Sequence, residues 1–156
     1  MEDEEFLPRL EVEELLARYA LGERDFEASD LSGVDLSGID LAAKAKRGII
    51  YNKRINLSSC NLSHANLSGA NLYRAFMIFA NLESVNLEGA NLWEAQLEGA
   101  QLKGANLRGT NLGATNFAGA DFTNADLSGA SWGFNAKDAF FKNTIMPDGT
   151  VMTGRG

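Results

Sequence analysis

Residues 80–109 read ANLESVNLEGANLWEAQLEGAQLKGANLRG, six copies of one five-residue phrase. The same phase runs from Ile55 onward, and every fifth residue is large and apolar over sixteen consecutive units. A period of five fits neither an amphipathic helix, at about 3.6 residues, nor a strand, at about 2. Internal repetition therefore decides the fold. The large apolar residues are Leu57, Leu62, Leu67, Leu72, Met77, Leu82, Leu87, Leu92, Leu97, Leu102, Leu107, Leu112, Phe117, Phe122, Leu127 and Trp132.

The composition is that of an ordinary globular chain. Its 156 residues suit one domain, with 45% apolar and 22% charged residues. There is one cysteine, no apolar run long enough to span a bilayer, and a first dozen residues rich in Glu and Asp, unlike a signal peptide. We therefore expect a cytoplasmic protein without a membrane span.

The run HANLSGANLYRA, followed by ANLESVNLEGANLWEAQLEGAQLKGANLRGTNL, resembles the pentapeptide-repeat family, whose consensus is A-(N/D)-L-x-x. The resemblance covers residues 55–134 without a gap. It implies an all-β solenoid, a right-handed quadrilateral β-helix in which four pentapeptides form one square coil and the central Leu and preceding small residue point inward. Only stacking can bury such units, and their uniform phase agrees with stacking. The leader LLARYALGERDF is similar to those of small cyanobacterial members.

The organisation expected from this resemblance is about five coils with an N-terminal α-helical cap and a short C-terminal cap. Phe26, Leu31, Leu36 and Leu41 repeat at five-residue spacing and form a first coil. The residues after it have no central Leu and would bury Lys46, so we interpret them as an inserted loop. An alternative keeps Tyr51 as an irregular central residue. The predicted segments are 1–23 acidic N-terminal helical cap, 24–43 first pentapeptide coil, 44–54 basic inserted loop, 55–134 four regular coils, and 135–156 C-terminal cap and tail.

Positions twenty residues apart should lie one above another if four units form a coil. Asn66, Asn86 and Asn106 would then stack into an amide ladder with a spacing of about 4.8 Å. Charged positions also fall one coil apart, and each exposed pair contributes only about 0–1 kcal/mol. The expected pairs are Arg74 with Glu94, Glu83 with Lys103, and Glu88 with Arg108.

Both ends of the stack need cover, because open coils expose backbone edges. Pro8 suits the first turn of an N-terminal helix and Gly22 its end, and the apolar side of that helix is Val12, Leu15, Leu16 and Tyr19. The repeat stops after Trp132, and we expect a C-terminal cap, with a dimer contact as the alternative. The apolar surface of the cap comes from Phe134, Phe140 and Phe141, and a β-turn is predicted at Pro147-Asp148-Gly149.

Residues 75–80, AFMIFA, place apolar side chains where the repeat has small polar ones. In the coil register Met77 points inward and its neighbours point outward. The candidate interaction patch consists of Tyr73, Phe76, Ile78, Phe79 and Trp93. The inserted loop could fold over this patch through Ile49, Ile50 and Tyr51, and the alternative is a homodimer or partner contact.

The inserted loop contains no acid, and its cations form the candidate basic loop: Lys44, Lys46, Arg47, Lys53 and Arg54. We expect it to meet an anionic surface or the acidic leader, because residues 1–14 carry seven acids and one Arg. Gyrase-protecting members of the family resemble B-DNA in surface charge, so a DNA mimic that modulates an enzyme such as gyrase is the alternative function. Residues 55–134 carry only six acids against three bases, which is weak for a mimic.

No catalytic, cofactor-binding or metal-binding residues are predicted. His64 is the single histidine and falls at an outward corner, while Cys60 occupies a small inward position, where a buried thiol is expected. The sequence therefore predicts a non-enzymatic structural or protein-interaction scaffold that uses no cofactor. Its partner is an unknown protein, a homodimer is left open, and no direct nucleic-acid binding is expected.

Overall fold

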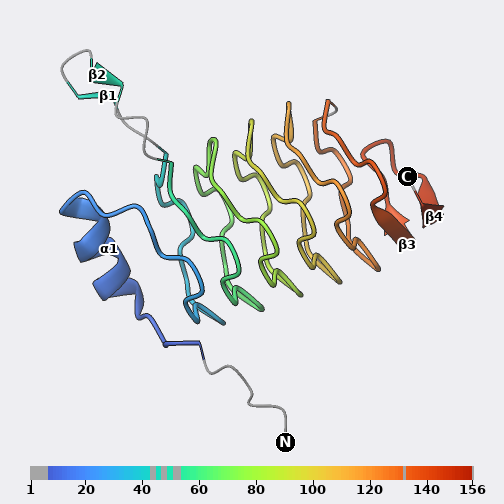
Figure 1. Cartoon of the computed structure of the whole chain (residues 1–156). Coiled ribbons are helices and arrows are strands. Elements are labelled where there is room, and N and C mark those ends of the chain that lie inside the picture. The colour runs from blue at the N-terminus through green and yellow to red at the C-terminus, as the bar shows by residue number, and fades with distance from the viewer. Residues whose placement is uncertain (1–6, 43–44, 47–48, 51–53, 132, 156) are drawn as a thin grey trace, which may run out of the picture.

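The computed structural model describes residues 7–42, 45–46, 49–50, 54–131 and 133–155. Successive coils of the chain stack along one axis into a solenoid (Figure 1). Helix α1 (Val12–Ala20) lies at one end of the stack, and strands β3 (Phe140–Ile145) and β4 (Val151–Arg155) lie at the other. The coils consist of single backbone bridges separated by tight turns. The predicted repeat solenoid is confirmed.

Neighbouring coils are joined in parallel at the residue before each central position. Asn61 bridges to Asn81, and Asn81 bridges to Gln101, so the offset is twenty residues. The Leu62 N–H donates to the Asn81 carbonyl (2.7 Å), and the Asn81 N–H donates to the Cys60 carbonyl (2.9 Å). In this way each coil satisfies backbone groups of the next, as a parallel sheet does. The predicted stacking of residues twenty apart is confirmed.

The first coil stacks on the next one at a different offset. Asp30 bridges to Asn61 and Asp35 to Asn66, which are each 31 residues apart. This offset equals one coil of twenty residues plus the eleven residues 44–54. The chain therefore leaves the stack after the first coil and re-enters it in phase.

The core is a continuous column of central residues and small residues inside the coils. The large central side chains are fully buried from the first coil onward, and from Leu57 to Leu127 the residue two positions earlier is buried beside each of them. Trp132, the last predicted central residue, lies outside the described residues. The described central residues are Phe26, Leu31, Leu36, Leu41, Leu57, Leu62, Leu67, Leu72, Met77, Leu82, Leu87, Leu92, Leu97, Leu102, Leu107, Leu112, Phe117, Phe122 and Leu127.

Amide ladders run along the outside of the coils. Asn86 Nδ2 donates to Asn66 Oδ1 (3.3 Å), and Asn106 Nδ2 donates to Asn86 Oδ1 (3.2 Å). Each amide oxygen also accepts the backbone N–H two residues later, as Asn86 does from Glu88 (3.1 Å). The predicted ladder is confirmed, and it fixes the turn within each coil as well as the contact between coils.

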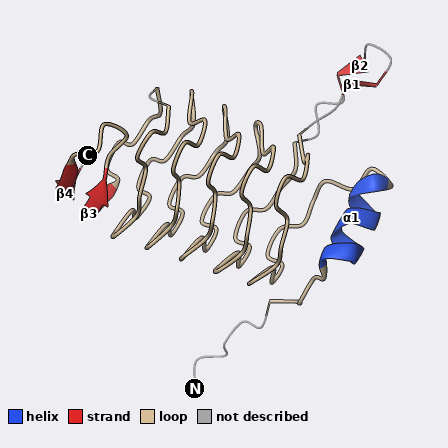
Figure 2. Ribbon diagram, turned by 180° about the vertical axis from the view of Figure 1, so that it is seen from behind, coloured by secondary structure: helices blue, strands red, loops and turns tan. Residues whose placement is uncertain are grey.

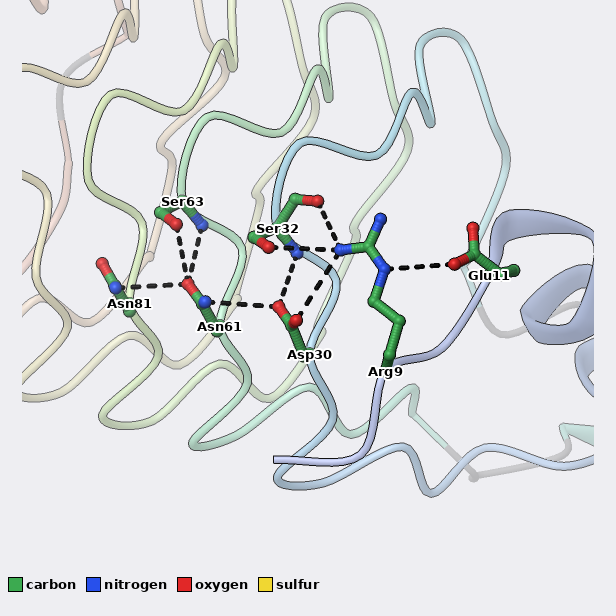
Figure 3. Close-up of polar contacts among 7 residues, drawn as sticks. All are labelled: Arg9, Glu11, Asp30, Ser32, Asn61, Ser63 and Asn81. Carbon is green, nitrogen blue, oxygen red and sulfur yellow. Dashed lines mark hydrogen bonds and ion pairs between the residues drawn. The ribbon is translucent and has the colours of Figure 1, made fainter. Parts of the chain in front are cut away.

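A second ladder shows how these rows end (Figure 3). Asn81 Nδ2 donates to Asn61 Oδ1, and Asn61 Nδ2 donates to Asp30 Oδ1, both at 3.2 Å. Arg9 closes the row, with its Nη1 3.7 Å from Asp30 Oδ2 and 2.7 Å from the Ser32 carbonyl. An aspartate suits the first coil, because it only has to accept from the following amide.

The N-terminal end differs from the prediction in one respect. Helix α1 begins at Val12, whereas Pro8 lies before it and its carbonyl accepts the Asp30 N–H (2.8 Å). Leu10 N–H donates to the Asp30 carbonyl (2.9 Å), and the Leu10 side chain is buried. The placement of Pro8 in the first helical turn is therefore wrong, because residues 8–10 extend the stack instead. The predicted apolar side of α1 does face the core: Leu15 is buried, and Val12, Leu16 and Tyr19 pack against the core.

The repeat continues further at the C-terminal end than the sequence indicated. Asn116 bridges to Asn135, Asp121 to Phe140, and Asp126 to Ile145, each with an offset of nineteen residues instead of twenty. One residue is thus missing from the coil, which moves Phe141, and not Phe140, into the buried central position. Phe140 is 41% exposed, so its predicted role in closing the coil is wrong, whereas Phe141 is buried and Phe134 packs against the core.

Strand β4 pairs antiparallel with β3, with Ile145 opposite Val151. The turn between them is the predicted one, since the Gly149 N–H donates to the Met146 carbonyl (2.8 Å). Asp148 Oδ1 accepts from the backbone N–H (3.0 Å) and the hydroxyl (2.6 Å) of Thr150. The pair adds a hairpin to the last coil.

A short hairpin connects the first coil to the second. Strands β1 (Ala45–Lys46) and β2 (Ile49–Ile50) pair antiparallel, with Lys46 opposite Ile49. In both views the β1–β2 hairpin projects from the end of the solenoid that carries α1 (Figures 1 and 2).

Candidate functional site

The coil register places the five predicted patch residues on one side of the solenoid. We call them the aromatic strip: Tyr73, Phe76, Ile78, Phe79 and Trp93. Phe79 is 68% exposed and Trp93 is 44% exposed, while the other three are half-buried. The coil register places Trp93 one coil beyond Tyr73, because Asn71 bridges to Asn91. The rest of the described chain thus leaves the two largest rings open to solvent.

Two glycines of the following coils make room for these rings. An ideal Cβ on Gly99 would lie 2.4 Å from Cδ1 and Cε1 of Phe79, and one on Gly113 would lie 2.4 Å from Cε3 and Cζ3 of Trp93. Each ring therefore rests directly on the backbone of a residue twenty positions later. This support holds two apolar rings close to the surface of the coils, where side chains on other corners extend into solvent.

Guanidinium groups border the strip on the side nearer α1. The Arg54 Cζ lies 5.1 Å from the centre of the Phe76 ring, and the Arg74 Cζ lies 5.8 Å from the centre of the Tyr73 ring. Both distances are within the range of a cation–π contact. Arg74 also forms the predicted ion pair with Glu94, with Nε 3.1 Å from Oε2. The most exposed rings, Phe79 and Trp93, have no such cation among the described residues.

Phe76 interrupts a polar ladder, and the backbone compensates. Phe76 stands between Asn56 and Gln96 in the row where other coils carry a hydrogen-bonding side chain. An Asn at that place would accept the N–H two residues later. Here the Ile78 N–H donates instead to Ser58 Oγ of the preceding coil (3.3 Å). The apolar residue therefore leaves no buried donor unsatisfied at this point.

An open pocket of about 460 Å³ adjoins the strip at the end of the solenoid near α1. Two arginines and two acids are among its lining residues, so their formal charges cancel. The arginine side chains are already stacked on rings, Arg24 on Tyr19 (3.7 Å) and Arg54 on Phe76. The lining residues are Gly22, Glu23, Arg24, Asp25, Arg54, Asn56 and Phe76. This composition selects no particular ligand.

The opposite side of the coils is charged, and its ion pairs differ from those predicted. Lys103 Nζ lies 3.5 Å from Asp121, and Arg108 Nη1 lies 3.9 Å from Asp126. The predicted pairs of these cations with Glu83 and Glu88 are therefore wrong. An aspartate in a ladder row has no amide to donate to the coil before it, and the cation of that earlier coil contacts the carboxylate instead.

Of the candidate basic loop, only the Arg54 side chain is described. Lys44, Arg47 and Lys53 lie outside the described residues, and for Lys46 the structure gives only its backbone pairing with Ile49. Among the described residues, Arg54 has no ion pair with a carboxylate. The expected association of the loop with an anionic surface or with the leader remains a prediction.

The remaining reactive groups occupy the expected places. His64 is exposed at a corner, with a φ of 58°. Cys60 is buried, its Sγ donates to the Phe26 carbonyl (3.0 Å), and burial raises the pKa of its thiol to about 11. Within the described residues there is no group of three metal-ligating side chains. Nor does any described helix have the length and apolar character needed to cross a membrane.

Sequence reasoning missed the two supporting glycines. A twenty-residue step from Phe79 leads to Gly99, and the same step from Trp93 leads to Gly113. The combination of a ring with a glycine one coil later is therefore readable from the sequence once the register is known. The stacking of Arg54 on Phe76 was also missed, because the end of the inserted loop has no fixed place in the repeat.

Comparison with known proteins gives the following matches. The chain matches the sequence family described as Pentapeptide repeats, in eight copies, over residues 53–89, 80–117 and 95–131. None of the curated proteins matches it. Among solved structures it is similar to Rfr23, a pentapeptide repeat protein of the cyanobacterium Cyanothece 51142. The identity is 32% over 87% of this chain and 95% of that chain, with a TM-score of 0.40.

Two further solved structures are similar. One is a pentapeptide repeat protein from Nostoc Pcc 7120, with 32% identity over 78% of this chain and 84% of that chain and a TM-score of 0.45. The other is a pentapeptide repeat protein from the thylakoid lumen of Arabidopsis thaliana, with 29% identity over 72% of this chain and 68% of that chain and a TM-score of 0.30.

Proposed function

The chain belongs to the pentapeptide repeat family, and on that premise we propose that it works without catalysis, as a scaffold that binds another protein through the aromatic strip. Members of this family are generally structural or interaction proteins. The observation that carries the proposal is the exposure of Phe79 and Trp93 within one twenty-residue coil. Exposed aromatic side chains that are held in place are the residues most enriched where protein partners bind.

The finer form of the fold is part of this proposal. We infer a right-handed quadrilateral β-helix of about five coils, covered at one end by α1 and at the other by the β3–β4 hairpin. The twenty-residue offset supports four pentapeptides per coil. The burial of Leu15 in α1 and of Phe141 in β3 supports the two covers. Such covers leave the sides of the solenoid as the surfaces for binding.

One side of the solenoid exposes apolar rings and the other carries charged residues, so the two sides differ as binding surfaces. Trp93 and Phe79 lie on the coil of residues 75–94, and the opposite corners of the next coil carry Lys103 and Arg108 in ion pairs. Water contact with a large ring is unfavourable by about 25 cal/mol for each Å² of apolar surface. A partner that covers these two rings gains this free energy, whereas binding at the charged side would have to break ion pairs.

Two observations support the absence of catalysis. The Cys60 thiol is buried and its pKa is raised, which disfavours the reactive thiolate. His64 is exposed at a corner, and none of its described neighbours forms a metal-ligating group with it. A binding role requires neither residue to react.

The DNA-mimic alternative finds less support. Three of the six acids in residues 55–134 form ion pairs: Glu94, Asp121 and Asp126. Neutralised carboxylates contribute little to a phosphate-like stripe. We retain two further proposals: the basic loop as a second contact for an anionic partner, and the cytoplasm as the compartment.

Affinity capture with strip variants tests the proposed function. Phe79→Gly with Trp93→Ser removes both exposed rings, and glycine suits the φ of 56° at residue 79. Glu83→Ser is the matched control, since residue 83 holds the same repeat position as Trp93 on the charged side. We expect the wild type and the control to retain the same partner and the double variant to lose it. All three should unfold within about 1 kcal/mol of one another.

Equal capture by the double variant and the wild type would contradict this function. A double variant that has lost its fold would show that the rings are structural, which also contradicts it. Circular dichroism melting on the same preparations separates these two outcomes.

A further inference from the structure

We propose that the partner of the aromatic strip is a second copy of this chain, packed antiparallel so that the two strips meet around a two-fold axis. The inference rests on the proposed function, because it names the partner of that same surface. Its basis is the order of charges along the strip. One border of the strip is cationic and the other is acidic.

The coil register fixes this order. Asn56 bridges to Phe76, and Phe76 bridges to Gln96, so three successive coils lie side by side in this row. Arg54 therefore lies one coil before the Phe76–Phe79 segment, and Glu98 lies one coil after it. A two-fold axis through the middle coil, perpendicular to this side of the solenoid, exchanges the first coil with the third. Arg54 of each copy then faces the Glu98 side of the other copy.

Arg54 and Glu98 can each form a further ion pair beyond their contacts in the single chain. Arg54 stacks on Phe76 and has no ion pair among the described residues. Glu98 Oε1 accepts from Asn116 Nδ2 (2.6 Å), but its Oε2 has no hydrogen-bond donor. This oxygen is covered by neighbouring atoms, so the proposed contact requires the carboxylate to rotate about its side-chain bonds to meet a guanidinium. The second copy supplies the donor that the single chain lacks.

The centre of the contact is apolar, and the apolar residues of one copy pack against those of the other. Under the same axis the outward residues of the middle coil, Phe76, Ile78 and Phe79, face the same set of residues in the second copy. In this arrangement Arg74 approaches the exposed ring of Phe79 in the second copy, which has no cation over it among the described residues of its own chain. Self-complementarity of this kind is what an isologous interface requires.

The overall charge favours the antiparallel arrangement over the parallel one. A parallel pair would place Arg54 at the coil of Arg54 in the second copy and Glu98 at the coil of Glu98, so neither group would meet an opposite charge. It would also bring together two copies of residues 7–14, which carry three acids and one Arg. The antiparallel pair places the two copies of residues 7–14 at opposite ends of the dimer.

Charge reversal tests the pairing, with the full chain studied by sedimentation equilibrium. The wild type is expected to form a dimer at concentrations up to roughly 100 μM, as suits a small, transient interface. Arg54→Glu alone and Glu98→Arg alone each place like charges in contact, and each should raise the dimer Kd by at least about tenfold. Glu83→Arg, at the same repeat position as Glu98 on the charged side, should leave the dimer unchanged.

Mixing gives the sharper readout. In an equimolar mixture of the Arg54→Glu and Glu98→Arg chains, both contacts of the mixed dimer join opposite charges, so mixed dimers should form where neither chain dimerises alone. The double variant Arg54→Glu/Glu98→Arg should also dimerise. A wild type that stays monomeric overturns the inference, as does a dimer that both single reversals leave intact. If the wild type is monomeric but binds a different partner, and the variant without the Phe79 and Trp93 rings loses that partner, the dimer is contradicted and the proposed function is retained.

Discussion

The indole ring of Trp93 lies over the backbone of Gly113, so close that a methyl group on Gly113 would come within 2.4 Å of ring atoms Cε3 and Cζ3. The two residues are twenty positions apart and stand on adjacent coils. This contact positions the exposed ring, and Gly99 does the same for Phe79. The outward positions of the repeat allow many residue types, yet a glycine lies under each of the two most exposed rings.

Gly113→Ala should displace the Trp93 ring from the surface of the coil. The backbone of Gly113 does not have a positive φ, so the added methyl group acts through the clash alone. Because the ring is half-exposed and can swing outward, we expect the free energy of unfolding to fall by less than about 1 kcal/mol. Tryptophan fluorescence should shift toward the value for a more hydrated indole.

The control for this prediction is the same substitution in a Trp93→Ala background. Gly113→Ala should then change the stability by only a few tenths of a kcal/mol, because the clash is gone. An equal loss of stability in both backgrounds would show that Gly113 matters for the backbone and not for the ring.

Phe141→Ala should destabilise the protein by about 3–5 kcal/mol, as expected for a fully buried phenylalanine. Its ring stacks on Phe122 with centres 5.1 Å apart and extends the core into the last coil. The neighbouring Phe140→Ala is the control and should cost much less, because Phe140 is 41% exposed. Urea unfolding of both variants measures the difference. Similar losses for the two would contradict the nineteen-residue offset of this coil.

Asn86→Asp should destabilise the stack by about 1–3 kcal/mol, because the aspartate cannot donate to Asn66 Oδ1 and places a carboxylate against that oxygen. Asp126→Asn, in the same row, is the matched control. It exchanges a contact with Arg108 for an amide that can donate to Asn106, so it should be nearly neutral. Thermal melting at neutral pH compares the two. A neutral Asn86→Asp would show that the ladder bonds contribute little.

Acid should weaken the protein through the aspartates at the ends of the rows. Burial alone would raise the pKa of Asp126, but the hydroxyl (2.6 Å) and backbone N–H (2.8 Å) of Ser128 outweigh it and hold the pKa below its usual range. A carboxylate with a lowered folded-state pKa stabilises the protein above its unfolded-state pKa, near 4. This stability is lost as the pH falls through the folded-state value.

Ser128→Ala should therefore raise the pKa of Asp126 and flatten the loss of stability below about pH 4. Ser63→Ala removes a similar hydroxyl bond (2.8 Å) from Asn61, which does not titrate, and serves as the control. Carboxyl chemical shifts measured by NMR across an acid titration give the pKa directly. An unchanged Asp126 titration in Ser128→Ala would contradict the assigned cause.

Most of the stack could be predicted from the sequence, because one rule fixes many contacts. The five-residue phase gives the buried positions such as Leu87, and the twenty-residue stacking gives the ladder through Asn86. The inserted length of eleven residues also agrees with the offset between Asp30 and Asn61. These features depend on local repetition, which each unit carries in its own residues.

The ends could not be predicted as well, because repetition no longer constrains them. A deletion of one residue shifts the last coil, and it decides that Phe141 and not Phe140 is buried. Arg108 forms its ion pair with Asp126 because Asp126 ends a ladder row, where an acid lacks the N–H donor that an amide would have. The aromatic strip stays a prediction from the sequence, and the support of its rings depends on which residue the next coil places beneath them.

The most direct test of the central claim, that this side of the solenoid is the binding surface, is photo-cross-linking from residue 79. Benzoylphenylalanine replaces Phe79 with a similar apolar side chain, and the same group at Ser84, the next corner along the coil, is the control. Mass spectrometry after irradiation in a cell lysate should find intermolecular products from position 79 and few from position 84. Products joined to the strip of a second chain also support the dimer, whereas products joined only to another protein support the binding surface and not the dimer. Equal yields from the two positions, or none from position 79, would contradict the account.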